Sequence, residues 1–138
     1  MNAYDKALSL IKIRPHYSGE LAQKLSLRGF KREQIEEVIN RLTEQRLLND
    51  VEFTENFLTN LMRLKTFGYF GLKMKLMQRG IAGQEAEALL KEKLSLETEK
   101  QIAQRFLAKQ KETDKTKLAQ KLARKGFRSE VIRESLNF

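Results

Sequence analysis

The chain contains no cysteine and only one histidine, His16. The lack of cysteine excludes a disulfide framework and any metal site built on thiolates. No segment has the composition of a signal peptide, and no apolar run is long enough to span a bilayer. We therefore expect a cytoplasmic protein without membrane association.

Proline occurs once, tryptophan is absent, and glycine occurs seven times among 138 residues. Charged residues make up 33% of the chain and hydrophobic residues 41%. Few helix breakers combined with many charges are typical of helices with solvated outer faces. The composition predicts an all-α fold with almost no strand.

A short pattern of leucines, a lysine and a glycine occurs three times, with the glycines 51 and then 46 residues apart. Two leucines four residues apart lie on one helical face, and the glycine supplies the left-handed residue that ends the helix. In a Schellman ending, the apolar residue after the glycine packs back onto the second leucine. The copies are Leu21, Lys24, Leu25, Gly29 and Phe30, then Leu72, Lys75, Leu76, Gly80 and Ile81, then Leu118, Lys121, Leu122, Gly126 and Phe127.

A period of about 50 residues accommodates three short helices, as in helical repeat arrays. We predict three tandem three-helix repeats at residues 1–48, 49–94 and 95–138, with about nine helices in an elongated, curved array and a monomeric chain. One compact domain is the alternative, because the length permits it. The expected N-caps are Asn2, Ser18, Asn49 or Asp50, Ser95, Asp114 and Ser129.

Groups that could carry out catalysis are scarce in this sequence. His16 stands beside the only proline, at a predicted helix joint, where a polar turn residue is favoured over a catalytic base. Most acidic residues fall on outer helix faces among lysines and arginines. No phosphate-binding loop is present, and we expect neither a cofactor nor a metal. An enzymatic function is therefore poorly supported.

The most aromatic stretch is the joint at residues 67–71, which contains Phe67, Tyr69, Phe70 and two glycines. A platform on which nucleic-acid bases stack is one interpretation. A helix joint with a packed aromatic side chain is the interpretation that we favour.

Basic residues outnumber acidic ones by 27 to 18, which gives a formal charge of +9. From residue 96 onward there are 11 basic and 6 acidic side chains. Such a surface attracts polyanions, whether or not binding them is its task.

Five cations near the C-terminus follow helical spacing, so they form one stripe if the helix extends that far. A solvated face usually mixes both signs of charge, which favours a binding surface here. The five residues are Lys117, Lys121, Arg124, Lys125 and Arg128. Smaller sets include Lys75 and Arg79, and Lys24 and Arg28. Their matching positions suit a repeating anionic partner, although duplication alone also explains them.

Taken together, the motifs resemble the RecX regulators of bacterial recombination over nearly the whole chain. The resemblance is carried by Glu20-Leu21-Ala22-Gln23-Lys24-Leu25 with Arg28-Gly29-Phe30, by Leu47-Leu48-Asn49-Asp50-Val51-Glu52-Phe53, by Lys65-Thr66-Phe67-Gly68 ahead of Lys75-Leu76-Met77-Gln78-Arg79-Gly80-Ile81, and by Lys125-Gly126-Phe127. Two positions depart from the family pattern, Tyr17 in place of a serine or threonine cap and Asn49 in place of an aspartate.

The resemblance implies a protein without enzymatic activity that binds the RecA recombinase filament on single-stranded DNA, contacts more than one subunit, and restrains ATP hydrolysis, strand exchange and co-protease activity. A direct DNA-binding helical-repeat protein is the rival hypothesis. In both cases the nine cations named above are the expected contact residues.

Overall fold

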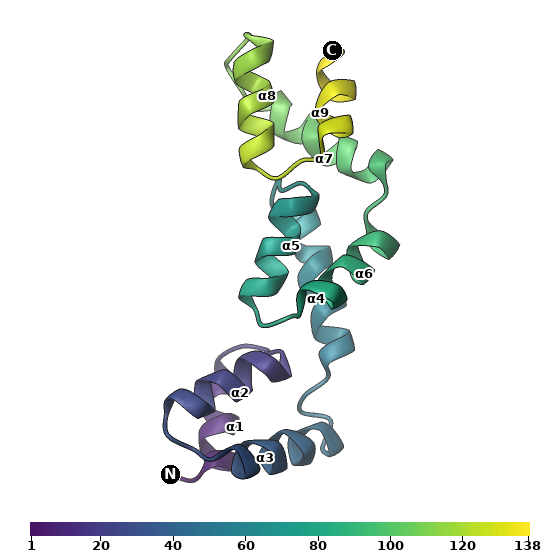
Figure 1. Cartoon of the computed structure of the whole chain (residues 1–138). Coiled ribbons are helices and arrows are strands. Elements are labelled where there is room, and N and C mark those ends of the chain that lie inside the picture. The colour runs from purple at the N-terminus through teal and green to yellow at the C-terminus, as the bar shows by residue number, and fades with distance from the viewer. The chain divides into compact units, whose positions relative to one another are not determined.

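The structure, a computed structural model, describes residues 1–138 and contains nine α-helices and no strand (Figure 1). The predicted all-α class is confirmed. The helices are α1 (Ala3–Ile13), α2 (Ser18–Leu27), α3 (Arg32–Glu44), α4 (Asp50–Leu64), α5 (Tyr69–Gln78), α6 (Gly83–Lys93), α7 (Leu96–Ala108), α8 (Lys115–Arg124) and α9 (Ser129–Leu136). No helix combines the length and the apolar character needed to cross a bilayer.

The chain folds into two compact units. The first contains residues 1–56 with 78–81, and the second contains residues 57–77 with 82–138. The division into three repeats stays a prediction.

The core of the first unit lies between α1, α2 and α3. Ala7, Leu21, Leu25 and Leu42 are completely buried there. Ile35 and Val38 pack beside them from the predicted face of α3. Burying one leucine side chain stabilises a fold by roughly 1.5–3 kcal/mol, so these contacts order the three short helices.

The second unit buries Leu72, Leu76, Leu90 and Leu122 completely. In α9 the buried residues are Val131 and Leu136, whereas Ile132, which we expected to face inward, is only partly buried. The prediction is therefore confirmed for Leu136 and wrong for Ile132, whose place in the core is taken by Val131.

The predicted left-handed glycine is confirmed at all three helix endings, and the Schellman bond is present at the first and the third. Gly29, Gly80 and Gly126 have φ angles of +89°, +96° and +85°. The Phe30 amide donates to the Leu25 carbonyl at 3.3 Å, and the Phe127 amide donates to the Leu122 carbonyl at 3.2 Å, which is the outer bond of a Schellman motif.

Four predicted N-caps are also confirmed. Each of these side chains accepts a hydrogen bond from an amide in the first turn of its own helix. They are Asn2 in α1, Asn49 in α4, Ser95 in α7 and Asp114 in α8.

The caps predicted at Ser18 and Ser129 are wrong. Each serine is the first residue inside its helix, and Tyr17 and Arg128 occupy the cap positions. Acidic side chains from other helices replace the missing caps. The carboxylate of Asp50 accepts from the Ser18 amide at 2.7 Å and from the Ser18 hydroxyl. The Glu99 carboxylate accepts from the Arg128 amide at 2.9 Å.

The aromatic joint before α5 packs against the third glycine ending, within the second unit. The Gly68 amide donates to the Lys125 carbonyl at 3.0 Å, and the Phe70 amide donates to the Gly126 carbonyl at 2.8 Å. A Cβ added at Gly126 would lie only 2.1 Å from the Gly71 nitrogen, so glycine permits this approach. Phe67 is partly buried, and the joint with a packed aromatic is confirmed.

Candidate functional site

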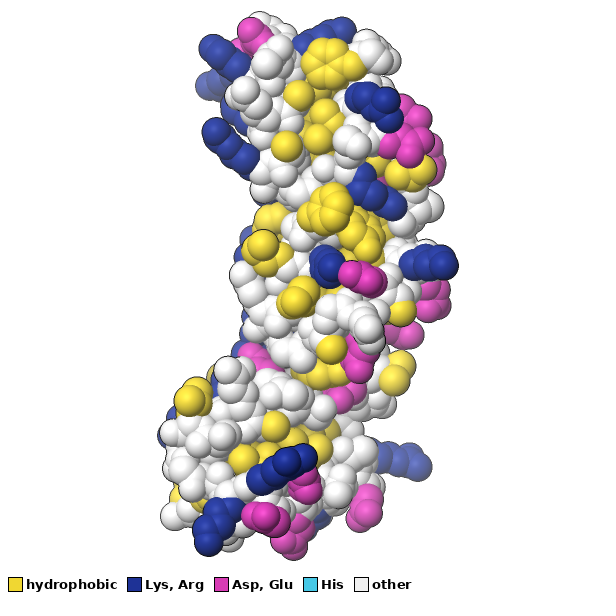
Figure 2. Space-filling model, in the orientation of Figure 1, with side chains coloured by type: hydrophobic (Ala, Val, Ile, Leu, Met, Phe, Trp, Pro, Cys, Tyr) yellow, Lys and Arg dark blue, Asp and Glu magenta, His cyan; other side chains and the backbone are white.

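Three of the predicted contact residues lie on one face of α8, at i, i+4 and i+7. We call Lys117, Lys121 and Arg124 the α8 basic face. Lys117 and Arg124 are exposed and Lys121 is half-buried. The helix contains no acidic residue. Figure 2 shows Lys and Arg side chains projecting from the surface around this helix.

The predicted stripe of five cations does not continue beyond α8. The helix ends at Arg124, and Lys125 is its C-cap residue. The Lys125 ammonium lies 4.3 Å from the centroid of the Phe67 ring, so this cation packs on an aromatic face instead of extending the stripe.

Arg128 is bound inside the protein. Its Nε donates to Oε1 of Glu99 at 2.5 Å, and its guanidinium lies 4.9 Å from the centroid of the Tyr69 ring. Glu99 is completely buried. A cation that balances a buried carboxylate is not free for a polyanion, because breaking a buried ion pair leaves an uncompensated charge. This placement corrects the expectation for Arg128.

The sequence analysis missed Glu99. Its second oxygen accepts from the Tyr69 amide at 3.0 Å and the Arg128 amide at 2.9 Å, so one carboxylate connects the first residue of α5 with the N-cap residue of α9. The sequence contains a signal for this role. Glu99 occupies the first position of an i, i+3, i+4, i+7 pattern whose other members are the apolar residues Ile102, Ala103 and Phe106. An acid at a core position of an amphipathic helix indicates a buried polar network.

Two residues of the α8 basic face, Lys117 and Lys121, have weak partners. Lys117 Nζ lies 3.8 Å from Oε1 of Glu112, and the lysine side chain is 66% exposed. Lys121 Nζ donates to Oε1 of Gln110 at 3.3 Å. Contacts of this kind contribute little and are readily exchanged for an external anion.

The corresponding cations of the first two copies have different environments. Lys75 Nζ lies 5.2 Å from the centroid of the Phe67 ring. Arg79 lies 3.7 Å from Glu20, and Lys24 lies 4.0 Å from the same carboxylate. Arg28 is exposed. Equivalent positions in the sequence therefore do not give equivalent surroundings.

His16 is buried at the start of α2, as a polar residue of a joint. Its Nδ1 lies 2.9 Å from the Arg14 carbonyl, and its Nε2 lies 2.9 Å from Lys24 Nζ. These partners fit a neutral ring in which Nδ1 donates and Nε2 accepts. Burial, together with the neighbouring Arg14 and Lys24 charges, lowers the pKa of His16, against the hydrogen bond to the Arg14 carbonyl.

Glu20 is the counter-charge of this cluster. Burial by itself would raise the pKa of the carboxyl, but the hydrogen bond and charge of Arg14, at 2.5 Å, and the charge of Lys24 lower it. The cluster gathers the cations Arg14, Lys24 and Arg79 around one carboxylate, beside the joint between α1 and α2.

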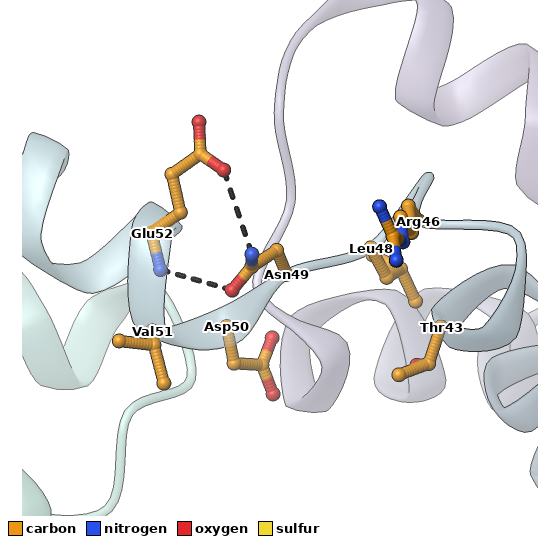
Figure 3. A pocket seen from close by; sticks show the side chains of 7 residues that line it. All are labelled: Thr43, Arg46, Leu48, Asn49, Asp50, Val51 and Glu52. Carbon is orange, nitrogen blue, oxygen red and sulfur yellow. Dashed lines mark hydrogen bonds between the residues drawn. The ribbon is translucent and has the colours of Figure 1, made fainter.

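A recess at the joint between α3 and α4 contains polar groups that bond to one another. The Asn49 side chain accepts from the Glu52 amide at 3.1 Å and donates to its carboxylate at 3.5 Å (Figure 3). The lining residues are Thr43, Arg46, Leu48, Asn49, Asp50, Val51 and Glu52. They include no nucleophile paired with a base. No group of acidic, histidine or cysteine side chains in the chain could hold a metal ion.

Fold and surface together define an all-α helical-repeat protein with cationic helix faces. Over residues 3–42 the chain matches the family model described as RecX, first three-helix domain. It is 34% identical to regulatory protein RecX of Prosthecochloris aestuarii, across 98% of this chain and 91% of that protein. It is 32% identical to regulatory protein RecX of Chlorobium limicola, across 94% and 84%.

A solved structure shares the fold. The crystal structure of RecX from Lactobacillus salivarius matches with a TM-score of 0.81 and 22% identity, covering 98% of this chain and 92% of that one. The chain belongs to the RecX family of regulatory proteins.

Proposed function

We propose that this protein binds the RecA recombinase filament on single-stranded DNA and restrains ATP hydrolysis, strand exchange and co-protease activity, and so acts in DNA repair and recombination. The observation that carries the proposal is the match to proteins named regulatory protein RecX along nearly the whole chain.

The α8 basic face is the first contact in this proposal. Lys115 and Lys117 lie in the first turn of α8, where the positive end of the helix dipole disfavours cations. An acidic protein surface or a phosphate relieves this repulsion. Lys75, Lys24 and Arg28 add further contacts, each modest, so affinity arises from several sites engaged at once.

The remaining properties follow from the same proposal. The protein works in the cytoplasm as a monomer, without enzymatic activity, cofactor or membrane association. The three predicted repeats, at residues 1–48, 49–94 and 95–138, contact neighbouring recombinase subunits.

The direct test adds sub-stoichiometric amounts of the chain to the cognate recombinase on single-stranded DNA. We expect ATP hydrolysis and strand exchange to fall, because one bound chain blocks more than one subunit. Unchanged rates at a chain concentration equal to that of the recombinase would remove the proposal.

A direct DNA-binding function is the second candidate, and the three cations on one face of α8, a helix with no acidic residue of its own, favour it. Under it, affinity for naked duplex DNA falls with salt by about 0.9 in log K per log salt for each phosphate neutralised. Replacing Lys117, Lys121 and Arg124 by alanine should then abolish binding to naked DNA. If the triple variant keeps its affinity for DNA but no longer binds the recombinase filament, the first proposal is favoured.

A further inference from the structure

The outer face of α5 carries an exposed apolar row. Phe70, Met74 and Met77 lie at i, i+4 and i+7 of the helix, and are 57%, 62% and 48% exposed. We call these residues the α5 apolar stripe. Figure 2 shows hydrophobic side chains at the surface of the second unit where Figure 1 labels α5.

The stripe is additional to the core face of α5. Leu72 and Leu76, on the other side of the helix, are completely buried. The Lys73 ammonium, at the edge of the stripe, donates to Glu87 at 2.6 Å, and this bond raises the pKa of Lys73. A helix that is apolar on both sides is expected to be covered on both sides, yet α5 is covered on one.

The equivalent helices show that the fold does not need these side chains. Counting back from the three glycine endings, the positions of Phe70, Met74 and Met77 are occupied in α2 by Gly19, Gln23 and Ser26, and in α8 by Thr116, Gln120 and Ala123. Those helices form the same ending with small or polar residues at all three places. The row of large apolar side chains belongs to the middle copy alone.

The charges around the stripe indicate what covers it. Residues 57–77, the segment of the second unit that contains the stripe, include no acidic residue and four cations, Arg63, Lys65, Lys73 and Lys75, of which Lys73 is paired with Glu87. A complementary surface is apolar with an acidic border. A second copy of this chain is disfavoured, because two equally cationic faces repel each other.

We propose that the α5 apolar stripe docks a protein surface that presents apolar side chains within a border of Asp or Glu. Two of its three residues are methionine, which adapts to apolar side chains and offers no ring for a base to stack on. The i, i+4, i+7 spacing is that of a helix placed in an apolar groove. The inference rests on the proposed function for its partner, and assigns this face to recombinase protein instead of DNA.

The test compares three forms of the full chain by co-sedimentation with recombinase filaments on single-stranded DNA. The stripe variant, F70T/M74Q/M77A, takes the residues of α8. The matched control, I13T/L27Q/V51A, changes three residues that are 80%, 81% and 69% exposed in the first unit. Circular dichroism establishes that both variants keep their helix content. We expect the stripe variant to lose at least tenfold in affinity and the control to bind like the wild type.

Each other outcome overturns the inference in a distinguishable way. If the wild type and the stripe variant bind filaments equally well, the stripe is not a docking surface, and the proposed function is unaffected. If the wild type does not bind filaments, both the docking surface and the proposed function are contradicted. If the stripe variant loses binding to naked single-stranded DNA to the same extent, the occupant is nucleic acid. If analytical ultracentrifugation shows a wild-type dimer and a monomeric variant, the occupant is a second copy.

Discussion

The Glu99 carboxylate accepts from the first amide of α5 and from the amide of the α9 N-cap residue, Arg128, and its charge balances the Arg128 guanidinium. Replacing it by glutamine keeps the shape but removes the charge and turns an amide donor toward these donors. We expect Glu99→Gln to lower the free energy of unfolding by about 2–3 kcal/mol, measured by urea denaturation. Glu97→Gln is the control, because Glu97 is on the same helix with a side chain that is 74% exposed. Equal effects of both changes would contradict the assigned role of Glu99.

His16 predicts a pH dependence of stability. Its pKa is lowered in the folded state, so the unfolded chain binds the proton more readily. The stabilisation is complete above pH 6.5, the ordinary value for histidine, and is lost as the pH falls through the lowered folded-state pKa. The free energy of unfolding falls by at most about 1.4 kcal/mol for each pH unit in this range. Urea denaturation of wild type and His16→Gln between pH 7.5 and 5 checks this, and parallel curves would exclude His16 as the cause.

For single residues, the sequence predicted the capping hydrogen bonds of side chains whose partners are close in the chain. Asn2, Ser95 and Asp114 cap their own helices, as expected. The acceptors for the first amides of α2 and α5 are Asp50 and Glu99, which lie 32 and 30 residues further along. Local propensity carries no information about a cap that arrives from another helix.

At the scale of elements, three glycines end equivalent helices in different surroundings. All have positive φ, where an added Cβ is strained, but a Cβ at Gly29 meets nothing within 4 Å, whereas one at Gly126 lies 2.1 Å from the Gly71 backbone nitrogen. We expect Gly29→Ala to cost about 1–2 kcal/mol from backbone strain alone. Gly126→Ala should cost more, because the α5 joint must also move.

Urea denaturation of the two variants measures the difference. The Gly80→Ala variant should fall between them, since its Cβ would lie 2.8 Å from the Glu20 amide nitrogen. Equal losses at all three positions would show that backbone strain is the whole effect. The repeated pattern predicted these endings, but the close approach of one ending to another helix needed the structure.

At the scale of the whole molecule, composition predicted the cationic surface but not which cations face solvent. Of the five residues expected to form one stripe, Lys117, Lys121 and Arg124 share a helix face, whereas Lys125 packs on Phe67 and Arg128 binds Glu99. Helical spacing assumed a helix that runs past Arg124, and the glycine ending stops it there. Internal neutralisation depends on Glu99, a residue far from the stripe in sequence.

The partner that we propose is a recombinase filament, and DNA alone is not sufficient for tight binding. The most direct measurement compares the affinity of the labelled chain for single-stranded DNA coated with the cognate recombinase and for the same DNA uncoated, by fluorescence anisotropy at physiological salt. We expect the chain to bind the filament at least tenfold more tightly than bare DNA. Equal or tighter binding to bare DNA would contradict it.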